Sequence, residues 1–222
     1  SLSESESAWW TDVVGVDGPP RATIANPLPL GPGLRSPLHR PVVLAAGRMV
    51  GSKQFDVIVR AFAAARRDGW HLRLVGEGPE VGKVRRTIRE EGMCDHVDLI
   101  AAVPDLTTEY VKASILVMAS KAEGQPLVAM EAQRAGVPVV AFDCPGGTAS
   151  VVTHERDGLL VPPDDADALA HALRRLIDDR TLRLAMGDAA WVSRHRFAPH
   201  LIAQQWADLL CDVATRPPRR SV

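Results

Sequence analysis

Two glutamates flank a turn near the middle of the sequence, Glu123 before the turn and Glu131 after it, in the pattern E-x7-E. The turn joins a predicted strand to a predicted helix. The amides of Gly124, Leu127 and Val128, around the start of this helix, therefore have no acceptor within it. Free amides at the positive end of a helix bind anions, and phosphate is the expected guest. We expect a phosphate site at this turn.

The two glutamates are too far apart to act on one bond. If the whole stretch were helical, they would lie roughly 12 Å apart, beyond the about 5 to 9.5 Å of paired glycosidase carboxylates. A carboxylate beside a phosphate turn can accept both hydroxyls of a ribose, so Glu131 fits a ribose and Glu123 the far end of the same ligand. Gln125 and Pro126 complete the predicted binding loop. On spacing alone, a solvated glutamate on a helix surface is an equal alternative.

Two basic residues follow the first predicted strand, in the sequence Gly47-Arg48-Met-Val-Gly-Ser-Lys53. Strand ends in open α/β sheets form the ligand crevice. Arg offers a planar fork and Lys a mobile point charge, so Arg48 and Lys53 could together stabilise a departing diphosphate without a metal. Taken alone, the pair could also be two surface charges.

Three further loops are candidates for the same site. The run Gly76-Glu-Gly78-Pro-Glu-Val-Gly82 is interpreted as a tight turn near the nucleotide, because its spacing and position do not match a dinucleotide fingerprint. Val103, followed by Pro-Asp, could place backbone groups beside a base or could only precede a helix cap. The loop Asp143-Cys-Pro-Gly-Gly147 could line a sugar pocket, and a purely structural turn explains it as well.

Short apolar runs alternate with helical periodicity from Pro41 onward, which is typical of β-α units around a parallel sheet. The predicted strands are Val42–Ala46, His71–Val75, Val97–Ala101, Ile115–Ala119, Val137–Ala141 and Gly158–Val161. The helices between them are predicted to start near Ser52, Pro79, Asp105 and Pro126, where a cap or a first-turn proline is favoured. The fold class is therefore α/β, a Rossmann-like parallel sheet of about six strands with helices on both faces.

Three regions follow from the distribution of these elements. Residues 1–40 are rich in Pro and Gly after a Ser/Glu start, which indicates a linker, and residues 41–196 form the predicted sheet domain. The sequence is predicted to be wholly helical after Pro163, with a first helix capped by Asp164 or Asp165. A second helix spans 180–193 and a last one about 198–213, so residues 197–222 form a C-terminal helix and tail.

Composition excludes several classes of protein. The 26 Lys and Arg nearly balance the 27 Asp and Glu, so no net field attracts nucleic acid and a phosphate site must be local. Cys94, Cys144 and Cys211 match no metal-binding spacing and are interpreted as reduced. No apolar run approaches the roughly 20 residues of a membrane span, and no signal segment opens the chain. We expect a cytoplasmic protein without a metal.

Together the two motifs resemble the family 4 retaining glycosyltransferases of the GT-B fold. The resemblance runs from about Asn26 to Val213 and is strongest in E-G-Q-P-L-V-A-M-E-A, from Glu123, continuing into A-G-V-P-V-V-A. Its second part is G-R-x4-K, from Gly47 to Lys53, with G-E-G-P between the two motifs. The chain departs from the family in Ala101-Ala102, in Cys144-Pro-Gly-Gly and at Gln54, where the family often has glycine.

The resemblance implies a role for each matching residue. Glu131 would bind the ribose hydroxyls, Arg48 and Lys53 would neutralise the leaving diphosphate, and Glu123 would contact the donor sugar. The backbone from Gly124 to Val128 would hold phosphate and sugar. Members of the family transfer a sugar from a nucleotide donor with retention and usually without a bound metal. A non-catalytic nucleotide-sugar-binding module and a sugar-nucleotide epimerase of the same architecture are the alternatives.

The resemblance also implies partners outside this domain. The family's acceptor domain would precede Ser1, so residues 1–40 would be its end plus a linker, and this chain alone would be nearly inactive. The acceptor, a glycan or lipid-linked glycan, would bind that domain, at the inner face of a membrane in the lipid-linked case. The last helix would cross back to it, so Trp206 and Leu209, with Trp9 and Trp10, are expected to form an exposed apolar patch prone to self-association.

Overall fold

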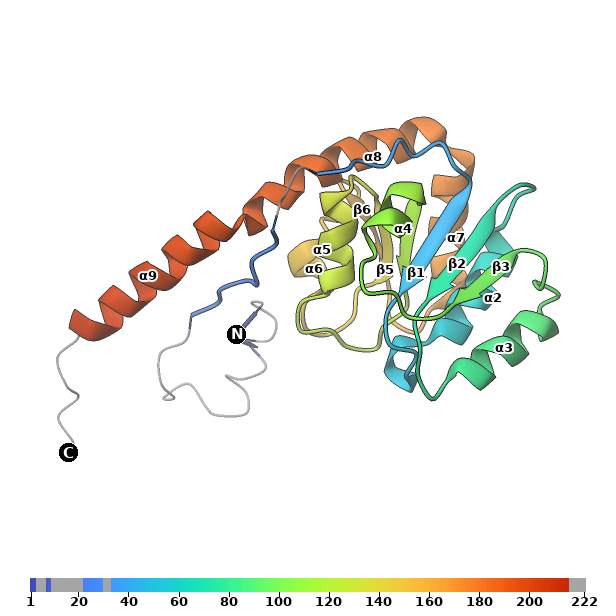
Figure 1. The fold of residues 1–222 in the computed structure, drawn as a ribbon, viewed down its shortest axis with the longest axis horizontal. Helices are drawn as coiled ribbons and strands as arrows, with labels where there is room; N and C mark the ends of the chain where they lie inside the picture. Colours follow the sequence, from blue (N-terminus) through green and yellow to red (C-terminus); the bar gives the residue numbers. More distant parts are fainter. Residues whose placement is uncertain (3–6, 9–21, 30–32, 216–222) are drawn as a thin grey trace.

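Six parallel strands form one sheet in the computed structural model, which describes residues 1–2, 7–8, 22–29 and 33–215 (Figure 1). The strands are β1 (Val42–Ala46), β2 (His71–Val75), β3 (Val97–Ile100), β4 (Ile115–Met118), β5 (Val139–Phe142) and β6 (Gly158–Val161). Their order in the sheet is β3-β2-β1-β4-β5-β6. The predicted Rossmann-like sheet is therefore confirmed.

Helices lie on both faces of this sheet. They are α2 (Phe55–Ala65), α3 (Val81–Glu90), α4 (Thr107–Lys112), α5 (Leu127–Arg134), α6 (Thr148–Val151), α7 (Ala166–Asp178), α8 (Arg180–Ser193) and α9 (Pro199–Thr215). Two short 3-10 helices, η1 (Gly51–Lys53) and η2 (Arg194–Phe197), precede α2 and α9. The helices α2, α3 and α7 supply apolar side chains to one core cluster, and α4 and α5 to the other.

The strands are apolar on both faces because both faces are covered. In β1, the side chains of Val43 and Ala45 enter the cluster with α2 and α7, and Leu44 between them enters the opposite cluster. All three residues are at most 1% exposed. Period-two alternation thus divides one continuous apolar run between two cores, as expected for a fully covered parallel sheet.

Several predicted helix starts differ from the structure. Ser52 is wrong as a cap, because it lies inside η1 and the residue before α2 is Gln54, in a left-handed conformation with φ 46°. Asp165 caps α7 as predicted, since its Oδ1 accepts the amide of Ala168 at 2.8 Å. The third helix begins at Thr107, and the Oδ1 of Asp105 accepts its amide at 2.8 Å.

Two further element starts differ by two residues from the prediction, and two short elements were missed. The helix expected at Pro79 begins at Val81, and β5 begins at Val139 rather than Val137. The amide of Val137 still bonds the carbonyl of Ala132 at 2.9 Å in the turn that ends α5, and Pro138 has no amide to donate. The three helices predicted after Pro163 are confirmed, since α8 spans the expected 180–193 and α9 begins one residue after its expected start, whereas the short elements η2 and α6 were not predicted.

The last helix, α9, extends away from the sheet domain (Figure 1). Trp206 is 50% exposed and Leu210 63%, Leu209 is half-buried, and Ile202 is the buried residue of this helix. The apolar patch predicted around Trp206 is thus present on α9, whereas Trp9 and Trp10 lie outside the described residues. Within the described parts of the chain, no helix has the length and apolar character needed to cross a bilayer.

Candidate functional site

The centre of the sheet has the topology of a ligand-binding crevice. From the neighbouring strands β1 and β4, the order runs outward to β2 and β3 on one side and to β5 and β6 on the other. Loops at such a switch point diverge beyond the carboxyl ends of the strands and leave a crevice. The segments after β1 and β4 meet there, since the amide of Lys121 donates to the carbonyl of Ser52 at 2.8 Å.

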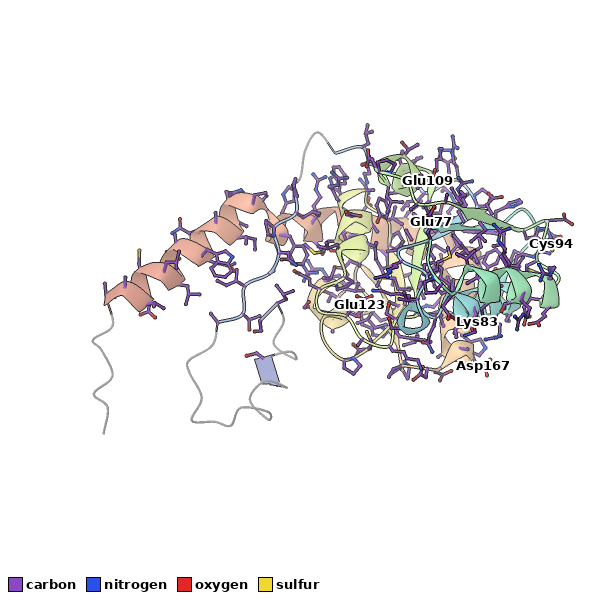
Figure 2. The ribbon with its side chains drawn as sticks, turned by 60° about the horizontal axis from the view of Figure 1, so that its bottom comes forward. Glu77, Lys83, Cys94, Glu109, Glu123 and Asp167 are labelled. Atoms are coloured by element: carbon purple, nitrogen blue, oxygen red, sulfur yellow. The ribbon has the colours of Figure 1, made fainter. Side chains whose placement is uncertain are left out.

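Lys53 and Glu123 come from these two segments and form an ion pair between Nζ and Oε1. Glu123 is labelled in Figure 2, in the loop between β4 and α5. Its side chain is 9% exposed and that of Lys53 is 31% exposed. A carboxylate so little exposed needs a positive partner. The structure therefore brings the predicted basic motif and the predicted E-x7-E motif to one edge of the sheet.

The backbone at Gln54 explains why glycine is expected at this position. Its φ of 46° and ψ of 48° lie in the left-handed region, where a non-glycine residue costs about 1–2 kcal/mol. The chain uses this conformation to pass from η1 into α2, directly after Lys53. The side-chain amide donates to Oδ1 of Asp164 at 3.0 Å, which stabilises the turn despite the strained backbone.

The loop after β2 packs on the loop after β1. The amides of Gly47 and Met49 donate to the carbonyls of Val75 and Glu77 at 3.0 and 2.7 Å. A Cβ added at Gly78 would lie 2.7 Å from the carbonyl carbon of Met49, which is closer than any side chain can approach. The predicted contact residue Gly78 thus has a structural role, because it lets the G-E-G-P loop support the segment that carries the basic pair.

Two adjoining cavities form a groove from the basic segment to Glu131. The first, of about 290 Å³, is lined by Gly47, Arg48 and Val103 among others. The second, of about 140 Å³, is lined by Val103, Tyr110 and Glu131 among others. Val103 and Leu106 belong to both linings, so the two cavities adjoin at these residues. Arg48 is exposed, and its guanidinium forms no ion pair with any described residue.

Glu131 is held by a residue that the sequence analysis missed. The hydroxyl of Tyr110, on α4, donates to Oε2 of Glu131 at 2.8 Å. Burial raises the pKa of Tyr110 well above its ordinary value, and the negative charge of Glu131 adds to this shift. The available signal was the single tyrosine of the sequence, in the short helix T-T-E-Y-V-K that follows the loop predicted to contact a base.

The start of α5 provides two of the three predicted free amides, whereas Gly124 lies before the helix and packs against Gly147. The helix begins at Leu127, Pro126 precedes it in an extended conformation, and no side chain caps it. Its first backbone bonds run from Ala129 and Met130 to the carbonyl of Pro126, so the amides of Leu127 and Val128 have no intrahelical acceptor. Leu127 is exposed, and its amide belongs to the positive end of the helix.

The C-P-G-G loop after β5 supports the first glutamate. Gly146 pairs with Glu123 in an isolated parallel bridge, and the amide of Glu123 donates to the carbonyl of Pro145 at 3.2 Å. A Cβ added at Gly147 would lie 2.6 Å from the carbonyl carbon of Gly124. The structural explanation of this loop therefore holds, since both glycines are needed for its close approach to the segment that carries Glu123.

Cys144, in the same loop, is buried beside the Oγ1 of Thr148 at 3.2 Å. Burial raises the pKa of its thiol, the Thr148 contact lowers it by less, and the charge of Glu123 raises it further. Cys144 is therefore an unreactive thiol in this loop.

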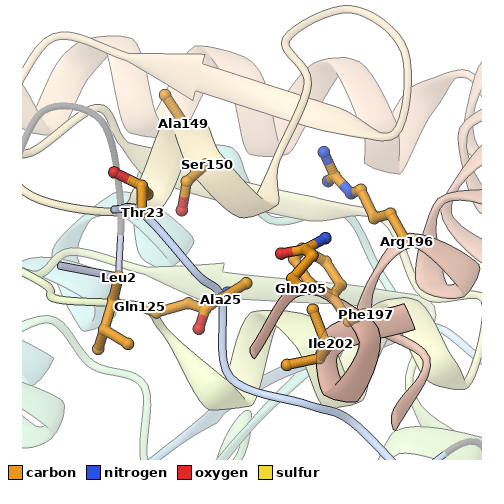
Figure 3. A pocket seen from close by; sticks show the side chains of 10 residues that line it. All are labelled: Leu2, Thr23, Ala25, Gln125, Ala149, Ser150, Arg196, Phe197, Ile202 and Gln205. Atoms are coloured by element: carbon orange, nitrogen blue, oxygen red, sulfur yellow. The ribbon is translucent and has the colours of Figure 1, made fainter. Parts of the chain in front are cut away.

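Gln125 is turned away from the other predicted contacts. Its amide oxygen accepts the amide of Asn26 at 2.6 Å, and its side chain lines a cavity of about 500 Å³ together with Arg196 and Ile202 (Figure 3). This cavity lies between the N-terminal segment, α6 and the start of α9. Gln125 thus links the loop to the N-terminal segment. Across the residues that the structure describes, no three His, Cys, Asp or Glu side chains gather as they would around a metal ion.

The chain is similar in sequence to known proteins. The family model described as glycosyl transferases group 1 matches residues 40–179, which contain both motifs. An exopolysaccharide phosphotransferase of Streptomyces coelicolor is 38% identical over 224 residues, covering 99% of this chain and 24% of that protein. A GDP-mannose-dependent alpha-(1-6)-phosphatidylinositol monomannoside mannosyltransferase of Mycobacterium tuberculosis is 34% identical over 168 residues, covering 70% of this chain and 43% of that protein.

The fold is also similar to solved structures. The structure of Anabaena HepE in complex with UDP superposes with a TM-score of 0.86 at 22% identity, over 96% of this chain and 63% of that chain. This likeness shows the fold, a sheet that matches one half of the GT-B architecture. The chain spans less than two thirds of the length of each of these three proteins.

Proposed function

Because the chain belongs to the group 1 glycosyl transferases, we propose that its groove binds the nucleoside diphosphate of a sugar donor. The observation that carries this proposal is the meeting of Lys53 and Glu123 at the switch point, beside a groove that runs from Arg48 to Glu131. The base lies near Val103, the ribose hydroxyls bind Glu131, and the diphosphate lies between Arg48, Lys53 and the first amides of α5. The donor sugar then reaches Glu123.

The proposed reaction is transfer of the sugar with retention at the anomeric carbon. The bond from this carbon to the diphosphate breaks, and the negative charge that develops on the leaving diphosphate is stabilised by Arg48 and Lys53. The two cations and the positive end of α5 supply the charge for which other enzymes use a metal ion, so we propose that no metal is required. The protein contributes position and electrostatics, and the acceptor hydroxyl is the nucleophile.

The acceptor we propose is a glycan or lipid-linked glycan bound largely by a further domain. The Mycobacterium relative is named for an acceptor that is a phosphatidylinositol mannoside, which supports this class. A second candidate is transfer of a sugar phosphate, because the Streptomyces relative is named a phosphotransferase and matches nearly the whole chain. The two proposed reactions differ in the leaving group. Sugar transfer releases a nucleoside diphosphate, whereas sugar-phosphate transfer breaks the bond between the phosphates and releases a nucleoside monophosphate.

Titration calorimetry of the 222-residue chain with UDP, GDP and ADP tests the donor site. We expect at least one diphosphate to bind, with the same affinity in EDTA. The variant Arg48→Met should lower this affinity about 10- to 100-fold, the equivalent of a lost charge-assisted contact of about 1.5–3 kcal/mol. Its stability should not change, because the guanidinium of Arg48 has no ion-pair partner among the described residues.

Arg67→Met is the matched control. Arg67 is also an exposed arginine, paired with Asp178 at 2.7 Å, but it precedes β2 and so lies at the opposite edge of the sheet. Its removal should leave diphosphate binding unchanged. Failure of all three diphosphates to bind at millimolar concentration, or equal effects of the two arginine variants, would contradict the proposed site.

Analysis of the nucleotide product decides between the reactions. With a nucleotide-sugar donor and an acceptor, the protein containing this chain should release a nucleoside diphosphate, and Glu123→Gln should abolish transfer while diphosphate binding persists. Release of a monophosphate supports the phosphotransferase instead. Epimerised donor without an acceptor, or binding without any turnover, supports the epimerase or the non-catalytic module.

A further inference from the structure

The hydrogen bond between Tyr110 and Glu131 gives a role to a residue outside the two motifs. The hydroxyl of Tyr110 lies 2.8 Å from Oε2 of Glu131, and Tyr110 is 1% exposed. We infer that Tyr110 is a positioning residue, which holds the Glu131 carboxylate in the orientation that selects the ribose of a bound nucleotide. This inference rests on the proposed function, because it assigns the means by which the same site recognises a ribonucleotide.

Glu131 needs such a partner because its helical neighbours do not hold it. Arg134 lies one turn further along α5, where an ion pair with Glu131 could form. The guanidinium of Arg134 instead donates to Oγ1 of Thr107 at 3.0 Å, and Glu131 has no ion pair with any described residue. Without Tyr110, the long side chain of Glu131 would be free to change rotamer at the mouth of the groove.

The number of acceptor sites on the carboxylate supports the same role. An ionised carboxylate can accept about four hydrogen bonds. Tyr110 uses one of them at Oε2, which leaves Oε1 and the remaining lone pairs for two vicinal ribose hydroxyls. The hydroxyl of Tyr110 is itself buried, so it requires an acceptor, and Glu131 is the acceptor that the structure provides.

The protonation state of Tyr110 keeps this arrangement intact. Burial and the charge of Glu131 raise the pKa of Tyr110 well above its ordinary value of about 10. A phenol keeps its proton at neutral pH even at that ordinary pKa, and the upward shift extends this to higher pH, so the hydroxyl of Tyr110 is the donor toward Glu131. The core holds the ring, since Tyr110 belongs to the same buried cluster as Leu116 of β4 and Met130 of α5.

Titration calorimetry with ribonucleoside diphosphates and their 2′-deoxy counterparts tests the inference. The wild-type chain should prefer UDP, GDP or ADP over the matching 2′-deoxy compound. Tyr110→Phe should lower the affinity for the ribonucleotide on the order of tenfold and the affinity for the deoxynucleotide by less, so that the preference shrinks. The double variant Tyr110→Phe with Glu131→Gln should bind like Glu131→Gln alone, because Tyr110 acts through Glu131.

Ser36→Ala is the control for loss of a buried hydroxyl near α4. Its Oγ donates to the carbonyl of Ala113 at 2.6 Å, directly after the helix, and does not contact Glu131. This variant should lose stability and keep the ribose preference. If Tyr110→Phe retains the full wild-type preference, or if the effects of the two site variants simply add, the inference is wrong although the proposed function survives. If the wild-type chain binds no diphosphate, both are wrong.

A spectroscopic measurement covers the case in which Tyr110→Phe does not fold. Tyr110 is the only tyrosine of the sequence, so tyrosine labelled with ¹³C at Cζ gives a single NMR resonance. This resonance should shift when a ribonucleoside diphosphate is added, and it should shift in Glu131→Gln without ligand. A resonance that responds to neither change would overturn the inference.

Discussion

Gly76→Ala should destabilise the protein strongly although it adds one methyl group. The φ of Gly76 is 150°, and a Cβ there would lie 3.0 Å from the carbonyl carbon of Gly47 and closer still to its oxygen. The unfavourable backbone conformation costs about 1–3 kcal/mol, and forcing the two loops apart costs about 1–3 kcal/mol. The loss of unfolded-state entropy returns about 0.4–1 kcal/mol. We expect a net loss of about 3 kcal/mol, which includes weakening of the Gly47–Val75 backbone bond.

Urea unfolding followed by tryptophan fluorescence measures this loss, with Gly82→Ala as the control. Gly82 belongs to the same glycine-rich run, but it lies in the first turn of α3 and an added Cβ meets nothing within 4 Å. Alanine there should stabilise the protein by about 0.5–1 kcal/mol, because alanine is the better helix former. A loss below about 1 kcal/mol in Gly76→Ala, or the same change in both variants, would refute the reasoning.

Three further predictions concern other parts of the molecule. Gln54→Val should lower the free energy of unfolding by about 1–2 kcal/mol, because a β-branched residue is strained at φ 46°, whereas Gln54→Gly should not lower it. Chemical unfolding measures both variants, and an equal loss of stability in the two would contradict this prediction. Asp56 forms an ion pair with Lys83 at 3.0 Å. Burial raises the pKa of Asp56, but Lys83 and Arg60 together lower it by more, so the net shift of this pKa is downward. Its contribution should therefore be present above pH of about 4 and disappear as pH falls through the folded pKa; acid unfolding of Asp56→Asn should lose this pH dependence, and an unchanged acid transition would argue against it. Trp206→Gln should reduce self-association in sedimentation velocity if the patch on α9 mediates it, and a concentration-dependent oligomer that persists in this variant would show that another surface is responsible.

The sequence was sufficient for the sheet and for the edge at which the candidate site lies. Alternation of apolar runs with helical periodicity identified all six strands to within two residues at each end. In parallel β-α units every strand points the same way, so residues that follow the strands gather at one edge. Lys53 and Glu123 could therefore be placed together without knowledge of the contacts between them.

Local turns were less predictable, because their signals compete. Ser52 and Pro79 have the composition of a helix start, but η1 and the turn before α3 move each start by two or three residues. The left-handed conformation of Gln54 could not be read from its residue type, since glutamine rarely adopts it. Such turns are decided by the segments on which they pack.

The sequence by itself determined the fold class, the order of the motifs and the edge of the sheet that carries the candidate site. These features follow from periodicity and chain direction, which are local properties. Only the tertiary structure decided which side chains meet: Lys53 with Glu123, Tyr110 with Glu131, and Gln125 with the N-terminal segment rather than with the groove. The physical reason is separation along the chain. Lys53 and Glu123 are 70 residues apart, and Tyr110 and Glu131 are 21 residues apart. Such contacts depend on how the loops pack against each other, which local sequence patterns do not determine.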